Sequence, residues 1–122
     1  MNGDVIRLQF PARPDYILAM RLTVSAVAER VGFDIEDIED LKVASAEACT
    51  LLLSSGAQQI ELSLTVQSGL ELLFEAQGGA AQAADDSDGL SQYLLDALVD
   101  TCEIGRSGGV VDSVRLQKAL LL

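Results

Sequence analysis

Hydrophobic residues recur at helical spacing in three segments of this chain and alternate with polar residues in five others. The clearest helical pattern lies between Phe33 and Gly56. Asp34 is placed to cap the helix N-terminus, and Gly56 supplies a stop. Phe33 and Ile38 have the spacing of a hydrophobic staple. The predicted buried face of this helix consists of Ile35, Ile38, Leu41, Ala44, Ala48 and Leu52.

Two further helical patterns flank this one. The first follows Pro11 and Pro14 and ends at Gly32, and only a very short joint separates it from the helix that begins after Phe33. These two helices must therefore pack closely, on the same side of a sheet. The other helix begins at Gly89. The predicted inward faces are Ile17, Met20, Val24, Val27 and Val31 for the first, and Leu90, Tyr93, Leu94, Ala97 and Leu98 for the last.

Alternating patterns predict strands at 5–10, 60–67, 70–75, 101–106 and 110–118. Ser68-Gly69 and the turn at 107–109 close two hairpins. Residues 77–88 are small and polar, have no period, and are expected to form a loop. The order β, α, α, β, β, loop, α, β, β predicts an α/β two-layer sandwich, in which helices cover one face of a mixed or antiparallel sheet.

Composition narrows the classes of function. The 122 residues are expected to form a single domain, 1–122, and 49% of them are hydrophobic. Eight Lys and Arg residues stand against 19 Asp and Glu, which gives a net charge of −11. This acidity argues against nucleic-acid binding, and it is explained either by a basic partner or by solubility alone. No signal peptide or membrane-spanning run is visible, so we expect a cytoplasmic protein.

The two cysteines, Cys49 and Cys102, fall in segments expected to be buried, as free thiols. Because the chain has no histidine, a zinc site is not expected. The apolar C-terminal residues 119–122 require burial or a partner.

Three runs of sequence resemble the anti-sigma factor serine kinases of the GHKL (HATPase_c) ATPase superfamily, and the similarity extends over nearly the whole chain. These runs are Tyr16-Ile17 through Arg21-Leu22-Thr23, Glu39-Asp40-Leu41-Lys42-Val43-Ala44 and Glu47-Ala48-Cys49-Thr50. The resemblance implies an ATP site built from three conserved boxes. In the first box, Glu-x-x-x-Asn, the Glu is a catalytic base and the Asn binds magnesium. Here Glu47 is retained, but Leu51 stands in place of the Asn.

The other two boxes are altered as well. The family pattern Asp-x-Gly-x-Gly corresponds here to Ala76, Gly78 and Ala80, so the carboxylate that recognises adenine is missing. The glycine pair at the start of the last helix becomes Gly89 and Ser91. Three parts of one nucleotide site are thus changed together. Magnesium requires oxygen ligands, and phosphoryl transfer depends on that electrostatic clamp. We therefore expect a pseudokinase that binds neither ATP nor magnesium productively.

The resemblance also implies partners. Kinases of this family dimerise and hold a sigma factor or a STAS-domain anti-anti-sigma protein, using the first helix and an arginine that corresponds in place to Arg21. We therefore expect a homodimer and a partner-binding role for Arg21, although a solvated surface arginine with a packed stem has the same sequence signature.

Three alternatives remain open at this point. Glu47, Gly78 and Gly89 are retained, which leaves room for an active ATP-dependent serine/threonine kinase. Ser87 after Asp86 is reminiscent of the attachment site of acyl carriers, but the predicted strands argue against that helical class, and Ser87 is more simply a helix cap. A plain structural subunit that only dimerises is the third alternative.

Overall fold

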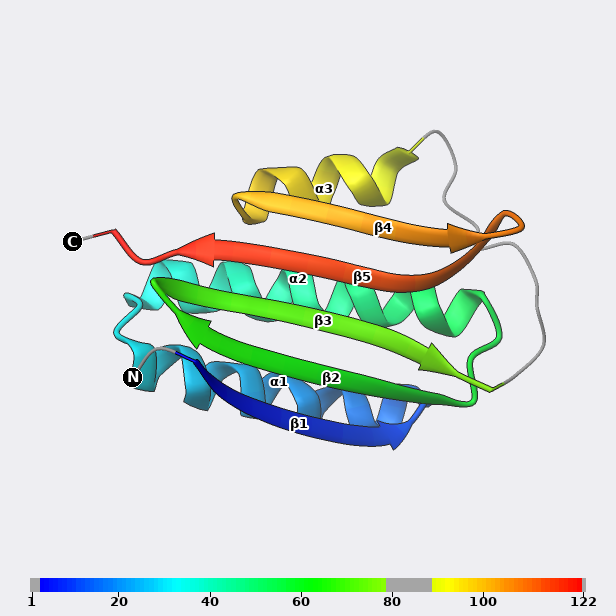
Figure 1. The fold of residues 1–122 in the computed structure, drawn as a ribbon, viewed down its shortest axis with the longest axis horizontal. Helices are drawn as coiled ribbons and strands as arrows, with labels where there is room; N and C mark the ends of the chain where they lie inside the picture. The colour runs from blue at the N-terminus through cyan, green and yellow to red at the C-terminus, as the bar shows by residue number, and fades with distance from the viewer. Residues whose placement is uncertain (1–2, 79–88, 122) are drawn as a thin grey trace.

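The computed structural model describes residues 3–78 and 89–121, and Figure 1 shows their arrangement. Within these ranges the chain forms five strands and three helices, in the order predicted from the sequence. The elements are β1 (Asp4–Pro11), α1 (Pro14–Val31), α2 (Ile35–Ser54), β2 (Gln59–Gln67), β3 (Gly69–Gln77), α3 (Leu90–Leu98), β4 (Thr101–Ser107) and β5 (Val110–Ala119).

The strands form one sheet in the order β1-β2-β3-β5-β4, and every neighbouring pair in it is antiparallel. The register aligns one row of apolar residues across all five strands: Leu8, Leu62, Phe74, Val114 and Ile104. Successive side chains of a strand point to opposite faces, so this row belongs to the face that meets the helices. The predicted two-layer α/β sandwich is confirmed, with a wholly antiparallel sheet.

The helices cover that apolar face. Figure 1 shows α1 and α2 side by side behind the sheet, with α3 beside β4 at the edge farthest from β1. The Asp34 carboxylate accepts a hydrogen bond of 2.8 Å from the backbone N–H of Asp37, as the predicted N-cap requires. Gly32 ends α1 in the left-handed conformation with φ of 113°, where a side chain is disfavoured. Local sequence therefore sets the bounds of α1 and α2.

Two predictions of burial are wrong. Ile35 was expected in the core but is 80% exposed, because Phe33 and Ile38 occupy the inward side of that first turn. The predicted inward face of α3 is mostly its outer face. Leu90, Tyr93, Leu94 and Ala97 are exposed, whereas Ser91, Leu95 and Leu98 face inward. Because the apolar arc of α3 is wider than the side that becomes buried, helical spacing could not select which part of it packs against α2 and β4.

Other predictions are refined by the structure. Strand β3 extends to Gln77, so the predicted loop begins later than expected, and residues 79–88 of it, including Ala80 and Ser87, lie outside the described residues. Cys49 is buried and Cys102 half-buried, and both are free thiols. Leu120 packs on the core, but Leu121 is 89% exposed. Among the residues described, no helix is long and apolar enough to cross a membrane.

Candidate functional site

The structure brings together two residues that belong to separate boxes of the predicted site. Glu47 lies half-buried on α2, and Ser91 lies in the first turn of α3 with 9% of its surface exposed. The Ser91 hydroxyl donates a hydrogen bond of 2.8 Å to Glu47 Oε2. The Glu47 carboxylate thus has a hydrogen-bond donor from within the protein. This contact joins the start of α3 to the middle of α2.

Leu51 lies one helical turn beyond Glu47 on α2. Its side chain is only 2% exposed and belongs to the main hydrophobic core, together with Ala48 and Leu52 from the same helix. The Leu51 carbonyl accepts hydrogen bonds from the backbone N–H and the hydroxyl of Ser55, both at 3.2 Å. The side chain at this position therefore contributes hydrocarbon and no ligand atom.

The remaining candidate residues lie on either side of residues 79–88. Ala76 is half-buried near the end of β3, and Gly78 follows that strand with φ of 68°. The positive φ constrains Gly78 in conformation, whereas the atom nearest to an added Cβ, Gln58 Oε1 at 2.8 Å, lies at the end of a flexible side chain that can move aside. Gly89 precedes α3, also with φ of 68°, and apart from its chain neighbours and the α3 backbone no described residue lies within 4 Å of a Cβ atom added there.

Arg21 belongs to a different part of the molecule. It is half-buried on α1, and in the part of the chain that the structure describes its Nε atom is buried without a hydrogen-bond partner. Figure 1 shows α2 between α1 and α3, so Arg21 is not part of the contact between Glu47 and Ser91. The predicted nucleotide site and the predicted partner-binding residue Arg21 therefore lie in separate parts of the molecule.

Sequence reasoning missed Lys118, which fixes the far end of α3. Its ammonium group donates a 2.7 Å hydrogen bond to the Leu98 carbonyl, in the last turn of the helix. The same nitrogen, Nζ, forms ion pairs with Asp37 Oδ1 at 3.6 Å and with Asp40 Oδ2 at 3.7 Å. The Lys118 side chain is 12% exposed. A cation is favourable at a helix C-terminus. The sequence could have indicated this role, because Lys118 follows Val114 and Leu116 in the alternation that places side chains on the inward face of β5. A charged group on that face requires a partner.

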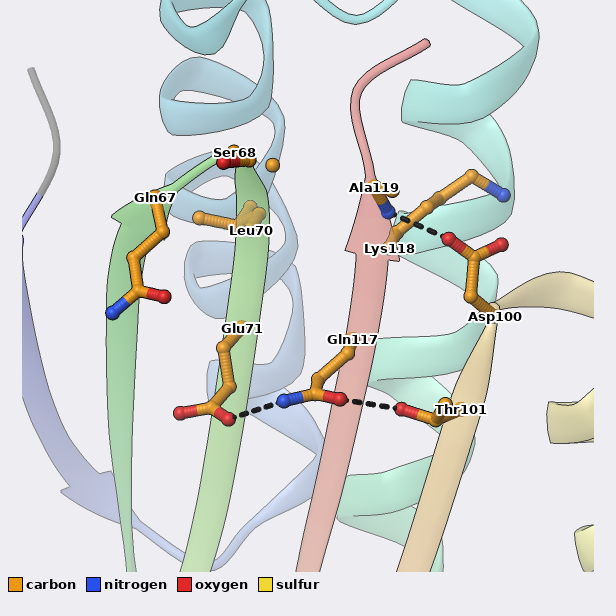
Figure 2. Close-up of a pocket in the computed structure, with 10 residues that line it drawn as sticks. Gln67, Ser68, Leu70, Glu71, Asp100, Thr101, Gln117, Lys118 and Ala119 are labelled. Carbon is orange, nitrogen blue, oxygen red and sulfur yellow. Dashed lines mark hydrogen bonds between the residues drawn. The ribbon is translucent and has the colours of Figure 1, made fainter.

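Three prominent hollows lie among the residues that the structure describes, and none of these three is lined by Glu47, Leu51 or Ser91. One, of about 290 Å³, lies where β3 begins and β5 ends, at the opposite end of β3 from Gly78 (Figure 2). Its polar groups pair with one another, since Gln117 donates to Glu71 at 2.7 Å and accepts from Thr101 at 2.8 Å. Of the other two, one of about 820 Å³ lies between α1 and β1, and one of about 430 Å³ lies beside Gly78.

No group of three or more metal-ligating side chains occurs among the described residues. Of the predicted site residues that the structure describes, Glu47 and Ser91 offer one carboxylate and one hydroxyl as metal ligands, and these two groups are already hydrogen-bonded to each other. Magnesium prefers a nearly octahedral set of oxygen ligands, which it completes with phosphate and water. A buried leucine at the third position does not fit that requirement.

Comparison with known proteins gives consistent matches over almost the whole chain. The family model described as the histidine kinase-like ATPase domain matches residues 10–118. The serine-protein kinase RsbW of Bacillus licheniformis is 33% identical over 126 residues, covering 94% of this chain and 79% of RsbW. RsbW of Bacillus subtilis strain 168 is 32% identical over 127 residues, covering 95% and 79%. RsbW of Bacillus cereus strain G9842 is 38% identical over 129 residues, covering 88% and 81%.

Among solved structures, the fold matches a chain that carries the RsbU and RsbW domains of Rv1364c from Mycobacterium tuberculosis. The TM-score is 0.72 at 14% sequence identity, and the match covers 95% of this chain and 32% of that one. At this identity the likeness concerns the fold alone.

Proposed function

We propose that this chain, which belongs to the histidine kinase-like ATPase domain family and is related to the RsbW serine-protein kinases, is a pseudokinase of the anti-sigma factor type. The family predicted from the sequence is confirmed by these matches. In the proposal, residues 1–122 act as one domain in the cytoplasm and bind a protein partner without binding ATP productively.

The observation that carries the proposal is the burial of Leu51. In the family pattern this position holds the asparagine that binds magnesium, and here its side chain is 2% exposed within the core. Without a ligand at this position, the negative charge of a triphosphate would meet an acidic protein with less screening. Positioning and electrostatic stabilisation are nearly all that a protein contributes to phosphoryl transfer.

The state of the neighbouring residues supports the same proposal. The Glu47 carboxylate, which corresponds to the catalytic base, accepts a hydrogen bond from Ser91. Ser91 itself stands where the family has a glycine that lets the backbone approach the phosphates. Ala76 provides no carboxylate for an adenine amino group. Each change removes a different kind of contact, so one compensating residue would not restore the site.

Isothermal titration of the full chain with Mg-ATP tests the proposal directly. We expect no binding up to millimolar nucleotide, with RsbW of Bacillus subtilis measured in parallel as the reference. Micromolar affinity for Mg-ATP would overturn the pseudokinase proposal.

A second candidate function is that of an active serine/threonine kinase. It is favoured by the retention of Glu47, Gly78 and Gly89 and by the names of the relatives, all of which are called serine-protein kinases. Phosphate transfer to a STAS-domain protein, measured with labelled ATP, separates the two functions. Transfer that is abolished by Glu47→Gln would establish the kinase, because the amide cannot take a proton.

For the partner we propose a sigma factor or a STAS-domain anti-anti-sigma protein, bound by a homodimer through α1. Arg21→Glu is expected to abolish capture of the partner while the domain stays folded. Arg30→Glu is the matched control, because Arg30 is an exposed arginine on the same helix. Equal loss in both variants, or no loss with Arg21→Glu, would remove Arg21 from the binding site. Light scattering on a sizing column measures whether the chain is a dimer, and a dimer that captures no partner would support a structural subunit instead.

A further inference from the structure

Helix α3 presents apolar side chains to solvent on the side that faces away from the core. Leu90 is 68% exposed, Tyr93 76% and Leu94 37%, and Ala97 is exposed beside them. We call these four residues the α3 outer face. The opposite side of the same helix is buried through Ser91 and Leu95. A helix on the surface of a globular protein usually carries polar residues on its outward side, and α3 does not.

The spacing of the α3 outer face is that of a helix which packs against another helix. Its members stand at positions i, i+3, i+4 and i+7, so their side chains form a single stripe along α3. Lys118 holds the C-terminal end of α3 and Ser91 holds its start, so the stripe is presented on a fixed element. A rigid apolar stripe with a large aromatic residue near its centre has the composition of a protein-binding surface.

The charges around the stripe define the chemistry of its partner. From Gly89 to Gly105 the chain carries three carboxylates, Asp96, Asp100 and Glu103, and no Lys or Arg. Asp96 and Asp100 are exposed, on the last turn of α3 and just beyond it, and Asp100 also accepts a hydrogen bond of 2.6 Å from the backbone N–H of Ala119. The ammonium group of Lys118 contacts the Leu98 carbonyl at this end of the helix, but its side chain is only 12% exposed, so the charge presented to a partner is mainly negative. A second copy of this chain, with a net charge of −11, would place like charges together at this surface. A positively charged partner would instead be attracted to it.

We propose that the α3 outer face is a docking surface for a basic amphipathic helix of another protein. The partner helix would lay its apolar side on Tyr93 and Leu90 and place its Lys or Arg residues beside Asp96 and Asp100. This surface lies at the β4 edge of the sheet, whereas Arg21 is on α1 on the other side of α2 (Figure 1). It is thus a second binding surface, and it does not depend on whether the chain binds ATP.

The test titrates the 15N-labelled full chain, without nucleotide, with a designed helical peptide. The peptide has Leu at positions i, i+3, i+4 and i+7 of each repeat and Lys elsewhere, and a control peptide has Glu in place of every Lys. We expect chemical-shift changes centred on α3 with the Lys peptide and none with the Glu peptide. The affinity should fall with added salt and with Asp96→Asn, a substitution that removes the charge while keeping an oxygen for the hydrogen bond from Gln92.

Substitutions in the α3 outer face test whether the apolar stripe is the contact. Tyr93→Ser and, independently, Leu90→Ser should each weaken Lys-peptide binding roughly tenfold or more, as for a central interface anchor. Val43→Ser, which changes an apolar residue that is 43% exposed on α2, should leave the affinity unchanged. Unchanged affinity in both α3 variants, equal binding of the Glu peptide, or shifts confined to other elements would each overturn the proposal.

Self-association is the competing explanation for the α3 outer face. Light scattering of the wild-type chain and of Tyr93→Ser separates the two. If the substitution converts a dimer into a monomer, the surface is an interface between copies of this chain, and the proposal of a basic partner is wrong. An oligomeric state that is the same in both chains, together with loss of peptide binding in the variant, supports it.

Discussion

Replacing Leu51 by asparagine restores the residue of the family pattern and tests whether its position is core or ligand site. In the structure the Leu51 side chain is 2% exposed and packs within the same core as Ala48 and Leu52. The asparagine amide would enter hydrocarbon with no partner arranged for it. If the position instead faced a hydrated nucleotide pocket, the same amide would be solvated at little cost.

The magnitude follows from two contributions. Removing a fully buried leucine side chain from the core loses about 1.5–3 kcal/mol of hydrophobic stabilisation. Burying an amide without hydrogen bonds costs about 1–3 kcal/mol more. Leu51→Asn should therefore lower the free energy of unfolding by about 2.5–6 kcal/mol, which is a large part of the roughly 5–15 kcal/mol that stabilises a typical domain.

Urea unfolding followed by circular dichroism measures this difference. Thr50→Asn is the matched control, because Thr50 is the adjacent residue on α2 and is exposed. Its free energy of unfolding should change by less than about 0.5 kcal/mol. Because Ala76 and Ser91 remain altered in both variants, neither should gain affinity for Mg-ATP in a calorimetric titration.

The reasoning is refuted if Leu51→Asn loses less than about 1 kcal/mol, since an isolated amide in the core could not be so well tolerated. Micromolar binding of Mg-ATP by this single variant would refute it in a second way. It would mean that Leu51 alone separates this chain from a working nucleotide site.

Three further predictions address the other contacts. Ser91→Ala removes the donor to Glu47 and should lower the free energy of unfolding by about 1–2 kcal/mol, and a double-mutant cycle with Glu47→Gln measures the coupling, which would be near zero if the contact were absent. Lys118→Met should lower it by about 1–3 kcal/mol through the lost hydrogen bond to the α3 carbonyl, whereas Lys42→Met, in an exposed pair, should lose less than about 0.5 kcal/mol in the same urea assay. Burial raises the pKa of the Cys49 thiol from 9.0 to about 12. The folded chain therefore keeps a proton that the unfolded chain releases, so the stabilisation is complete below pH 9 and is lost as the pH rises towards 12; Cys49→Ala should make that decline shallower.

Much of the architecture followed from interactions that span only a few residues. The cap at Asp34 and the left-handed stop at Gly32 act within one turn of helix, and the structure confirms both. The strand alternation that placed Leu62 and Leu64 inward is likewise visible in any window of a few residues, and both are buried. Family membership also followed from the sequence, through the runs around Arg21 and Glu47, and the comparisons with known proteins confirm the family.

The faces of helices at the edge of the fold were a different matter. Helical spacing grouped Leu90, Tyr93 and Leu94 as the core side of α3, but Ser91 and Leu95 are the residues that pack inward. Since α3 has apolar residues on both sides, only its position against α2 and β4 decides which side is buried. The same holds for Ile35. It has the helical spacing of the buried residues of α2, but in the first turn Phe33 and Ile38 take the inward positions and Ile35 is exposed.

By itself the sequence determined the order of the elements, the helix ends at Asp34 and Gly32, and the presence of Leu51 where the family has an asparagine, because each of these depends on a few neighbouring residues. Only the tertiary structure decided that Leu51 is buried, that Ser91 reaches Glu47 across 44 positions, and that Lys118 holds the end of α3. These facts depend on which elements meet, and that is set by the burial of the whole apolar face of the sheet at once.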